Sequence, residues 1–271
     1  MAALFDTLLH YSFMQKALAA AFLCSIAFGI TGPFIVAKRL TFLAGGIAHA
    51  VLGGIGIAYF LQASTTAGSI AAAVFFAFVL TVTRGTGHDE DTMVSTLWAA
   101  GMSVGIIFIY LTPGYNADLV SFIFGNILMV KTGDLAVIAV LDLVVITAVV
   151  VFYYHFVYLT FDEDYMKTRG NRTRIIYFFL LVLVALCVVV TIKIVGLILV
   201  IALVTLPTVI ATIYVRGLRA MMIVAACIGI ILTVSGIIIA FSFNIPASAC
   251  IILLASFLYF ISLLIKRVFA S

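Results

Sequence analysis

Charged residues are scarce in this sequence. Only 9% of its 271 residues are Asp, Glu, Lys or Arg, while 66% are hydrophobic, and the mean hydropathy is +1.38. Soluble domains carry about 25% charged residues, so a chain of this composition cannot be wetted on all sides. No long hydrophilic block is left for a second domain. We therefore expect residues 1–271 to form one domain embedded in lipid.

The sequence also has few cysteines and lacks a nucleotide-binding loop. The four cysteines, Cys24, Cys187, Cys227 and Cys250, lie in apolar segments, where a thiol acts as a small hydrophobe, and we predict no disulfide. No glycine-rich loop is followed by Lys and Ser or Thr. We expect the chain not to be an enzyme and to hold no permanent cofactor. No small-residue cleavage site follows a short apolar core, so we expect the first helix to be retained.

Long apolar runs recur along the whole chain. One transmembrane helix needs about 20 such residues. The sequence offers nine segments of this kind, at 14–37, 42–62, 66–83, 91–112, 134–158, 175–193, 195–215, 218–241 and 246–265. The segment Asp118–Val130 is apolar but too short to span, which is typical of an interfacial or re-entrant piece. We predict an all-α transmembrane bundle of nine spans, or eight if one of them is re-entrant.

Positive charge is distributed unevenly between the two ends of these spans. Of the 14 Lys and Arg residues, only Lys16, Lys131 and Lys193 lie on the side of the N-terminus. Cytoplasmic loops carry the excess of Lys and Arg. We therefore predict a multi-pass protein of the cytoplasmic (inner) membrane, with its N-terminus outside and its C-terminus in the cytoplasm. Its surroundings are then membrane lipid, and we expect no nucleic-acid partner.

His49 lies inside the second predicted span, beside a stripe of glycines. Gly45, Gly53 and Gly56 lie four before, four after and seven after it, on the same helical face. Two interpretations are open. The glycines could let another helix pack closely, with His49 hydrogen-bonded to that neighbour. Alternatively, the stripe borders a translocation pathway in which neutral imidazole meets a divalent transition metal.

Asp142 is the second ionisable residue deep in a predicted span. A charge there is costly, so it needs a partner or a purpose. Pairing with Lys131 or Lys193 is one interpretation, and a place in the same pathway as His49 is the other.

Two acidic clusters precede predicted helices. They are formed by His88, Asp89, Glu90 and Asp91, and by Asp162, Glu163 and Asp164. Carboxylates at a helix start complement the helix dipole and cap free amides. Capping is therefore the favoured interpretation over a metal site.

Two basic residues precede a small-residue helix with a His-Ala pair in AKRLTFLAGGIAHAVLGGIG, residues 37–56. This arrangement resembles the second-helix signature of the zinc and manganese ABC importer permeases. Four more stretches resemble that family in the same order: DEDTMVSTLWAAGMSVGI, SFIFGNIL, FDEDYMKTRGNRTR with IKIVGLILVIALVTLPTVIAT, and FNIPASACIILLA.

The resemblance implies a type II ABC importer permease-like fold and a set of partners. These are cytoplasmic ATP-binding subunits, a second permease copy or paralogue, and an extracytoplasmic metal-binding protein. It implies that His49 binds the transported zinc or manganese ion. The family's aspartate four residues earlier is replaced here by Gly45, so a second ligand must come from elsewhere, with Asp142 one candidate. Imidazole favours zinc.

The resemblance also implies an element that couples the chain to its ATPase. It is expected between two late spans, with Pro207 breaking the helix. The residues assigned to it are Pro207, Thr208, Arg216, Gly217 and Arg219. Two alternative functions stay open: a permease for a metal chelate or siderophore, and a proton-coupled secondary carrier, whose usual repeat halves are not seen in the sequence.

Overall fold

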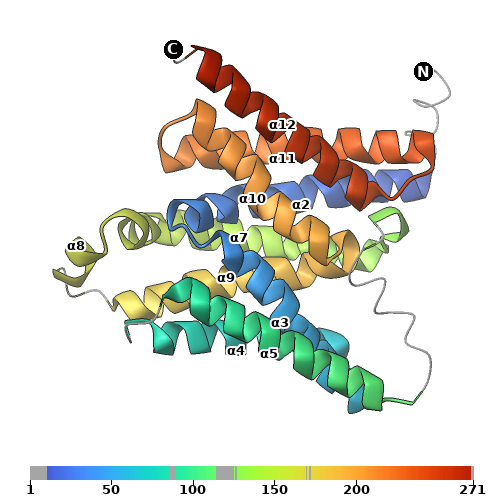
Figure 1. The fold of residues 1–271 in the computed structure, drawn as a ribbon, viewed down its shortest axis with the longest axis horizontal. Coiled ribbons are helices and arrows are strands. Elements are labelled where there is room, and N and C mark those ends of the chain that lie inside the picture. Colours follow the sequence, from blue (N-terminus) through green and yellow to red (C-terminus); the bar gives the residue numbers. More distant parts are fainter. Residues whose placement is uncertain are drawn as a thin grey trace.

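The computed structural model describes residues 11–85, 89–113, 125, 127–168, 170 and 172–269, and in this part of the chain all regular structure is helical. The elements are α2 (Ser12–Ala37), α3 (Thr41–Phe60), α4 (Thr65–Thr83), α5 (Glu90–Leu111), the 3-10 turn η1 (Ile127–Met129), α7 (Thr132–Phe161), α8 (Glu163–Thr168), α9 (Thr173–Val195), α10 (Leu197–Tyr214), α11 (Leu218–Phe243) and α12 (Ala247–Phe269). Figure 1 shows their arrangement.

Nine of these helices are long and apolar enough to cross a membrane, counted over the described residues. Each lies within a few residues of a predicted span, because an apolar run of about 20 residues can satisfy its backbone in lipid only as a helix. The all-α, nine-span prediction is confirmed. Most of Asp118–Val130, expected to be interfacial or re-entrant, lies outside the described residues.

The bundle is arranged around α2 and α9. Helix α2 packs against α7, α10 and α11, while α9 packs against α3, α4 and α7. Helices α3, α4 and α5 form a group at one side, joined most extensively through α3 and α5 (Figure 1). Large side chains such as Phe28, Phe34 and Tyr177 are almost fully buried at these contacts.

Two glycines allow successive spans to follow one another with almost no loop. Gly196 alone separates α9 from α10, and Gly217 directly precedes α11. Their φ angles of +83° and +92° lie in the region that favours glycine. Gly217 therefore fixes the direction in which α11 leaves the short 215–217 link.

Candidate functional site

His49 lies on α3 and stacks on Trp98 of α5. The two ring centroids are 4.4 Å apart and the ring planes differ by 12°. The imidazole is half-buried, and its Nδ1 atom is enclosed without a hydrogen-bond partner. The expected hydrogen bond to a neighbouring helix is therefore not what holds this ring. A buried polar atom without a partner needs an explanation, and a ligand outside the chain is one.

The glycine stripe of α3 is divided between two environments. A Cβ added to Gly53 would lie 2.8 Å from the backbone oxygen of Gly101 of α5. One added to Gly56 would lie 2.6 Å from the backbone oxygen of Gly105. These two glycines therefore bring α3 and α5 into backbone contact. A Cβ on Gly45 would meet only Ile201 of α10, at 3.5 Å, an ordinary van der Waals distance. Gly53 and Gly56 thus serve helix packing in this chain, and a role for the stripe in a pathway stays a prediction.

A polar face runs along α5 next to Trp98. It is formed by Asp91, Thr92, Ser95, Thr96 and Ser103, which are exposed in the isolated chain. Three of these hydroxyls donate to carbonyls of their own helix: Ser95 to Asp91, Thr96 to Thr92 and Ser103 to Ala99. Polar residues inside spans face other protein or a water-filled cavity rather than lipid. This face is therefore better suited to a partner subunit or an aqueous pathway than to lipid.

Asp142 lies elsewhere in the bundle. It is buried on α7, and α7 packs chiefly on α2 and α9. Cys24 of α2 and Cys187 of α9 are close enough to interact with it electrostatically. Both of its carboxyl oxygens are enclosed without a hydrogen-bond partner. The expected pairing with Lys193 is not found, because Lys193 instead donates to Thr66 at the start of α4.

No group of three or more His, Cys, Asp or Glu side chains gathers into a metal site within the described part of the chain. His49 therefore has no ready partner set in a single copy of this chain. Asp142 as its second ligand remains a prediction.

The segment assigned to ATPase coupling differs from expectation. Helix α10 continues through Pro207 to Tyr214, so the expected break at the proline is wrong. Pro207 and Thr208 are buried, and the hydroxyl of Thr208 donates to the Val204 carbonyl, 3.3 Å away. Surrounding spans can satisfy the carbonyl freed by a proline, which a single-helix rule does not consider.

Three residues assigned to the same segment remain accessible. Arg216 and Gly217 are exposed in the short link before α11, and Arg219 is exposed in the first turn of that helix. Only these three could touch another subunit directly. The other exposed candidate at this end of the bundle is the short helix α8, most of whose side chains are exposed.

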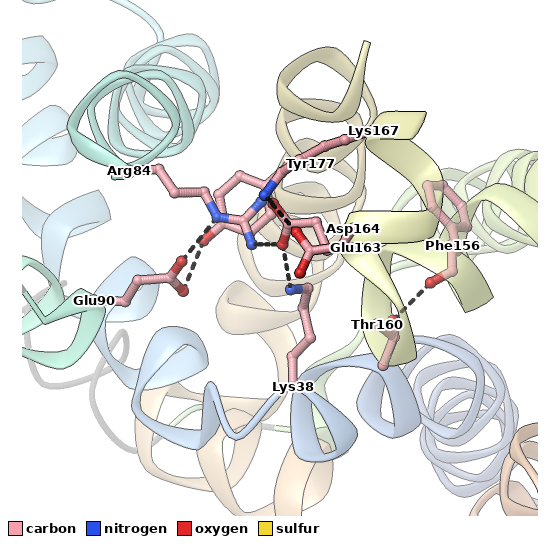
Figure 2. A network of polar contacts seen from close by, with 9 residues as sticks. All are labelled: Lys38, Arg84, Glu90, Phe156, Thr160, Glu163, Asp164, Lys167 and Tyr177. Atoms are coloured by element: carbon pink, nitrogen blue, oxygen red, sulfur yellow. Dashed lines mark hydrogen bonds and ion pairs between the residues drawn. The ribbon is translucent and has the colours of Figure 1, made fainter. Parts of the chain in front are cut away.

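An ion-pair network joins several helix ends here (Figure 2). Arg84, which follows α4, contacts Glu90 of α5 at 3.0 Å and Glu163 of α8 at 2.5 Å. Its guanidinium lies over the ring of Tyr177 of α9, 3.9 Å from the centroid, and the Tyr177 hydroxyl donates to Glu90 at 3.1 Å. Lys38, after α2, reaches Glu163 at 3.8 Å.

Burial and the nearby charge of Arg84 lower the pKa of Lys38. Lys167 lies in solvent at the edge of the network, where its hydrogen bond to Asp164 raises its pKa. The network is therefore tightest around the Arg84 guanidinium, which joins α4 to both α5 and α8.

These contacts revise the expected role of the acidic clusters. Asp162 caps α8, because its side chain accepts from the amide of Tyr165 at 3.0 Å. Asp89 occupies the N-cap position of α5 but makes no side-chain capping bond, and His88 lies outside the described residues. Glu90 and Glu163 both bind Arg84. Glu163 is 79 residues from Arg84 in the chain, so no local pattern predicts that contact.

Replacing Arg84 with Met is expected to destabilise the bundle by about 2 kcal/mol, between the values for exposed and buried ion pairs. The change leaves Glu90 and Glu163 near each other without the cation that separates them. Lys167→Met is the matched control. It removes a partner of Glu163 that is 57% exposed, and we expect a loss of no more than about 0.5 kcal/mol. Thermal unfolding of the two purified variants in detergent measures the difference, and equal midpoints would contradict this role of Arg84.

Comparison with known proteins places this helical membrane protein among the permeases of ABC transporters. The model of the ABC 3 transport family matches residues 10–266. The chain belongs to this family, and the family assignment from the sequence motifs is confirmed.

Among curated relatives, a probable metal transport system membrane protein of Chlamydia muridarum is 38% identical over 257 residues, covering 92% of this chain and 88% of that protein. The manganese transport system membrane protein MntC of Halalkalibacterium halodurans is 33% identical, covering 94% and 88%. A chain of the solved structure of PsaBC from Streptococcus pneumoniae in complex with Fab has a TM-score of 0.86 at 28% identity, covering 96% of this chain and 94% of that chain.

Proposed function

We propose that this chain is the membrane-spanning permease of an ATP-driven importer for a divalent transition-metal ion. The observation that carries the proposal is a half-buried imidazole with an unbonded nitrogen, held between two spans of an ABC 3 family fold. Neutral imidazole is a common ligand for such metals. The names of the relatives, which include metal and manganese transport systems, support the same cargo.

We propose manganese as the cargo in preference to zinc. Imidazole alone favours zinc, but three of the relatives are named as manganese transport systems. Oxygen ligands suit manganese, and the exposed hydroxyls of α5 supply oxygens next to Trp98. A cargo ion must also leave, so a weak or shared ligand set is compatible with transport.

The proposed partners are those expected from the family. A second copy or paralogue would cover the polar face of α5, so that two His49 residues could contribute to one pathway. ATP-binding subunits would meet α8 and Arg216 at one end of the bundle, and an extracytoplasmic metal-binding protein would dock at the other. Access would alternate as ATP binds and is hydrolysed on those separate subunits. The solved chelate-type transporter, with a TM-score of 0.76 at 13% identity, shows only a similar fold and does not support a chelate cargo.

The charge distribution supports an orientation with the N-terminus outside and the C-terminus in the cytoplasm. Eleven of the 14 cations lie at the end that would be cytoplasmic. In intact cells stripped of any outer layer, external protease should remove a tag placed before Asp6 and spare one after Ser271. Cleavage of the second tag alone would reverse the proposed orientation.

The function is tested by reconstituting the permease with its ATPase partner in vesicles. Labelled manganese is supplied with zinc or iron as competitor. ATP-dependent manganese accumulation that excess zinc reduces only weakly is the expected result. Accumulation of zinc in preference to manganese would overturn the choice of metal but keep the class of cargo.

A further inference from the structure

An apolar groove opens on the flank of the bundle between α7 and α11. Both helices pack on α2 (Figure 1), whose Ile30 lies at the base of the groove. Val149 and Val150 of α7 form one wall, and Met222 and Ile223 of α11 form the other. The groove has a volume of about 450 Å³. Val150 and Ile223 are 70% and 66% exposed, so the groove is open along its side.

One cation, Arg219, closes one end of this groove. Its guanidinium lies 4.6 Å from the centroid of the Tyr153 ring, and its other close neighbour is Tyr154. Over the described residues Arg219 forms no ion pair with an Asp or Glu side chain. Tyr153 and Tyr154 engage the guanidinium by side-chain hydrogen bonds, but a guanidinium has five N–H donors, so others remain for an anion. The groove therefore ends at a positive charge that lacks an anionic partner within the described part of the chain.

This end of the groove lies at the level of a membrane surface. Helix α7 has 30 residues and a kink at Phe152. The part from Thr132 to the kink is about 30 Å long at 1.5 Å per residue, which matches a hydrocarbon core of about 30 Å. Tyr153 lies roughly 30 Å along α7 from its start, and Arg219 lies in the first turn of α11. Tyrosines and snorkelling arginines are typical of the lipid headgroup region.

We propose that this groove binds an anionic phospholipid, with its phosphate on Arg219 and one acyl chain between α7 and α11. Charge complementarity selects the headgroup, because Arg binds phosphate through short charge-assisted hydrogen bonds. Basic pockets between spans are known sites for anionic lipid headgroups. The apolar walls match an acyl chain, and they offer no polar group to a soluble ligand below the level of Tyr153.

A lipid accounts for the groove better than a second protein chain does. The polar face, which is better suited to protein or water than to lipid, lies on α5, in the group formed by α3, α4 and α5. The groove lies between α7 and α11. The groove walls are aliphatic and suited to contact with lipid. Bound lipid would join α7 to α11, two helices that both pack on α2.

The test measures lipid retained by the purified permease, using phosphatidylglycerol and phosphatidylcholine with identical acyl chains. Native mass spectrometry is expected to show one phosphatidylglycerol per chain held in preference to phosphatidylcholine. Arg219→Gln should reduce that preference about tenfold, the loss of one charge-assisted contact. Arg216→Gln is the matched control, since it removes one exposed cation three residues earlier, and it should keep the preference within about twofold.

A second variant tests the acyl site without altering charge. Val150→Trp adds bulk at an exposed apolar position of the groove wall and should reduce retention of both lipids. Inorganic phosphate at millimolar concentration should not displace phosphatidylglycerol if the chain contributes to binding. Equal losses in the Arg219 and Arg216 variants would overturn the proposal, as would displacement by phosphate. Disulfide cross-linking of Ile223→Cys between two copies would also overturn it, because a second chain would then cover the groove.

Discussion

Replacing His49 with alanine is expected to reduce ATP-driven metal uptake by at least about tenfold while expression and assembly stay near normal. Removing a residue that only hydrogen-bonds to a metal ligand typically lowers metal affinity by about 10- to 100-fold. His49 is proposed as a direct ligand, so its removal should cost at least as much. The imidazole makes no hydrogen bond in the described structure, so its removal costs mainly its stacking on Trp98. Uptake into vesicles, normalised to assembled complex, measures the change.

Two further variants separate ligation from packing. His49→Asp should recover more uptake than alanine, because a carboxylate can also bind a divalent cation. Trp98→Leu removes the stacking partner but keeps the imidazole, so it should retain more uptake than His49→Ala. If the alanine variant transports at the wild-type rate, the imidazole is not a required ligand and its role is packing.

Gly56→Val is expected to prevent stable assembly, whereas Gly45→Ala should be tolerated. Even the first carbon of a side chain at Gly56 would lie 2.6 Å from the Gly105 oxygen, a backbone atom that cannot rotate away. Overpacking of this kind costs about 1–3 kcal/mol or more, and here it would force α3 away from α5. At Gly45 the same carbon meets the end of the Ile201 side chain at 3.5 Å.

The two glycine variants are compared by size-exclusion profile and thermal unfolding in detergent. Both positions are buried on one helix, and the first carbon added at each meets different surroundings. A stable Gly56→Val variant would contradict the close α3–α5 packing. Loss of assembly in Gly45→Ala would show that this position is more tightly enclosed than the structure indicates.

The spans could be predicted from sequence because lipid leaves the backbone few choices. The runs that became α2 to α5, α7 and α9 to α12 are apolar for about 20 residues each, and their length identifies them. The prediction of a helix break at Pro207 failed because packing against other helices decides the structure there. A rule for a single helix places a break there, but neighbouring helices bury that proline and allow α10 to continue.

The site was only partly predictable. The spacing of Gly45, His49, Gly53 and Gly56 predicted one shared helix face. It could not show that α5 presents Gly101 and Gly105 to the last two glycines, or that Gly45 meets Ile201 of α10 instead. Trp98 was missed, although a single tryptophan in the whole chain was a usable signal. The contact of Arg84 with Glu163 depends on how α4 meets α8, which no local pattern in either segment encodes.

The most direct measurement is ATP-dependent uptake of labelled manganese into vesicles that hold the wild-type permease and its ATPase partner. We expect accumulation that requires ATP, that is absent without the permease, and that falls to background in His49→Ala. Manganese accumulation that is independent of ATP, or that is unchanged in the alanine variant, would contradict an ATP-driven permease in which His49 binds the transported ion.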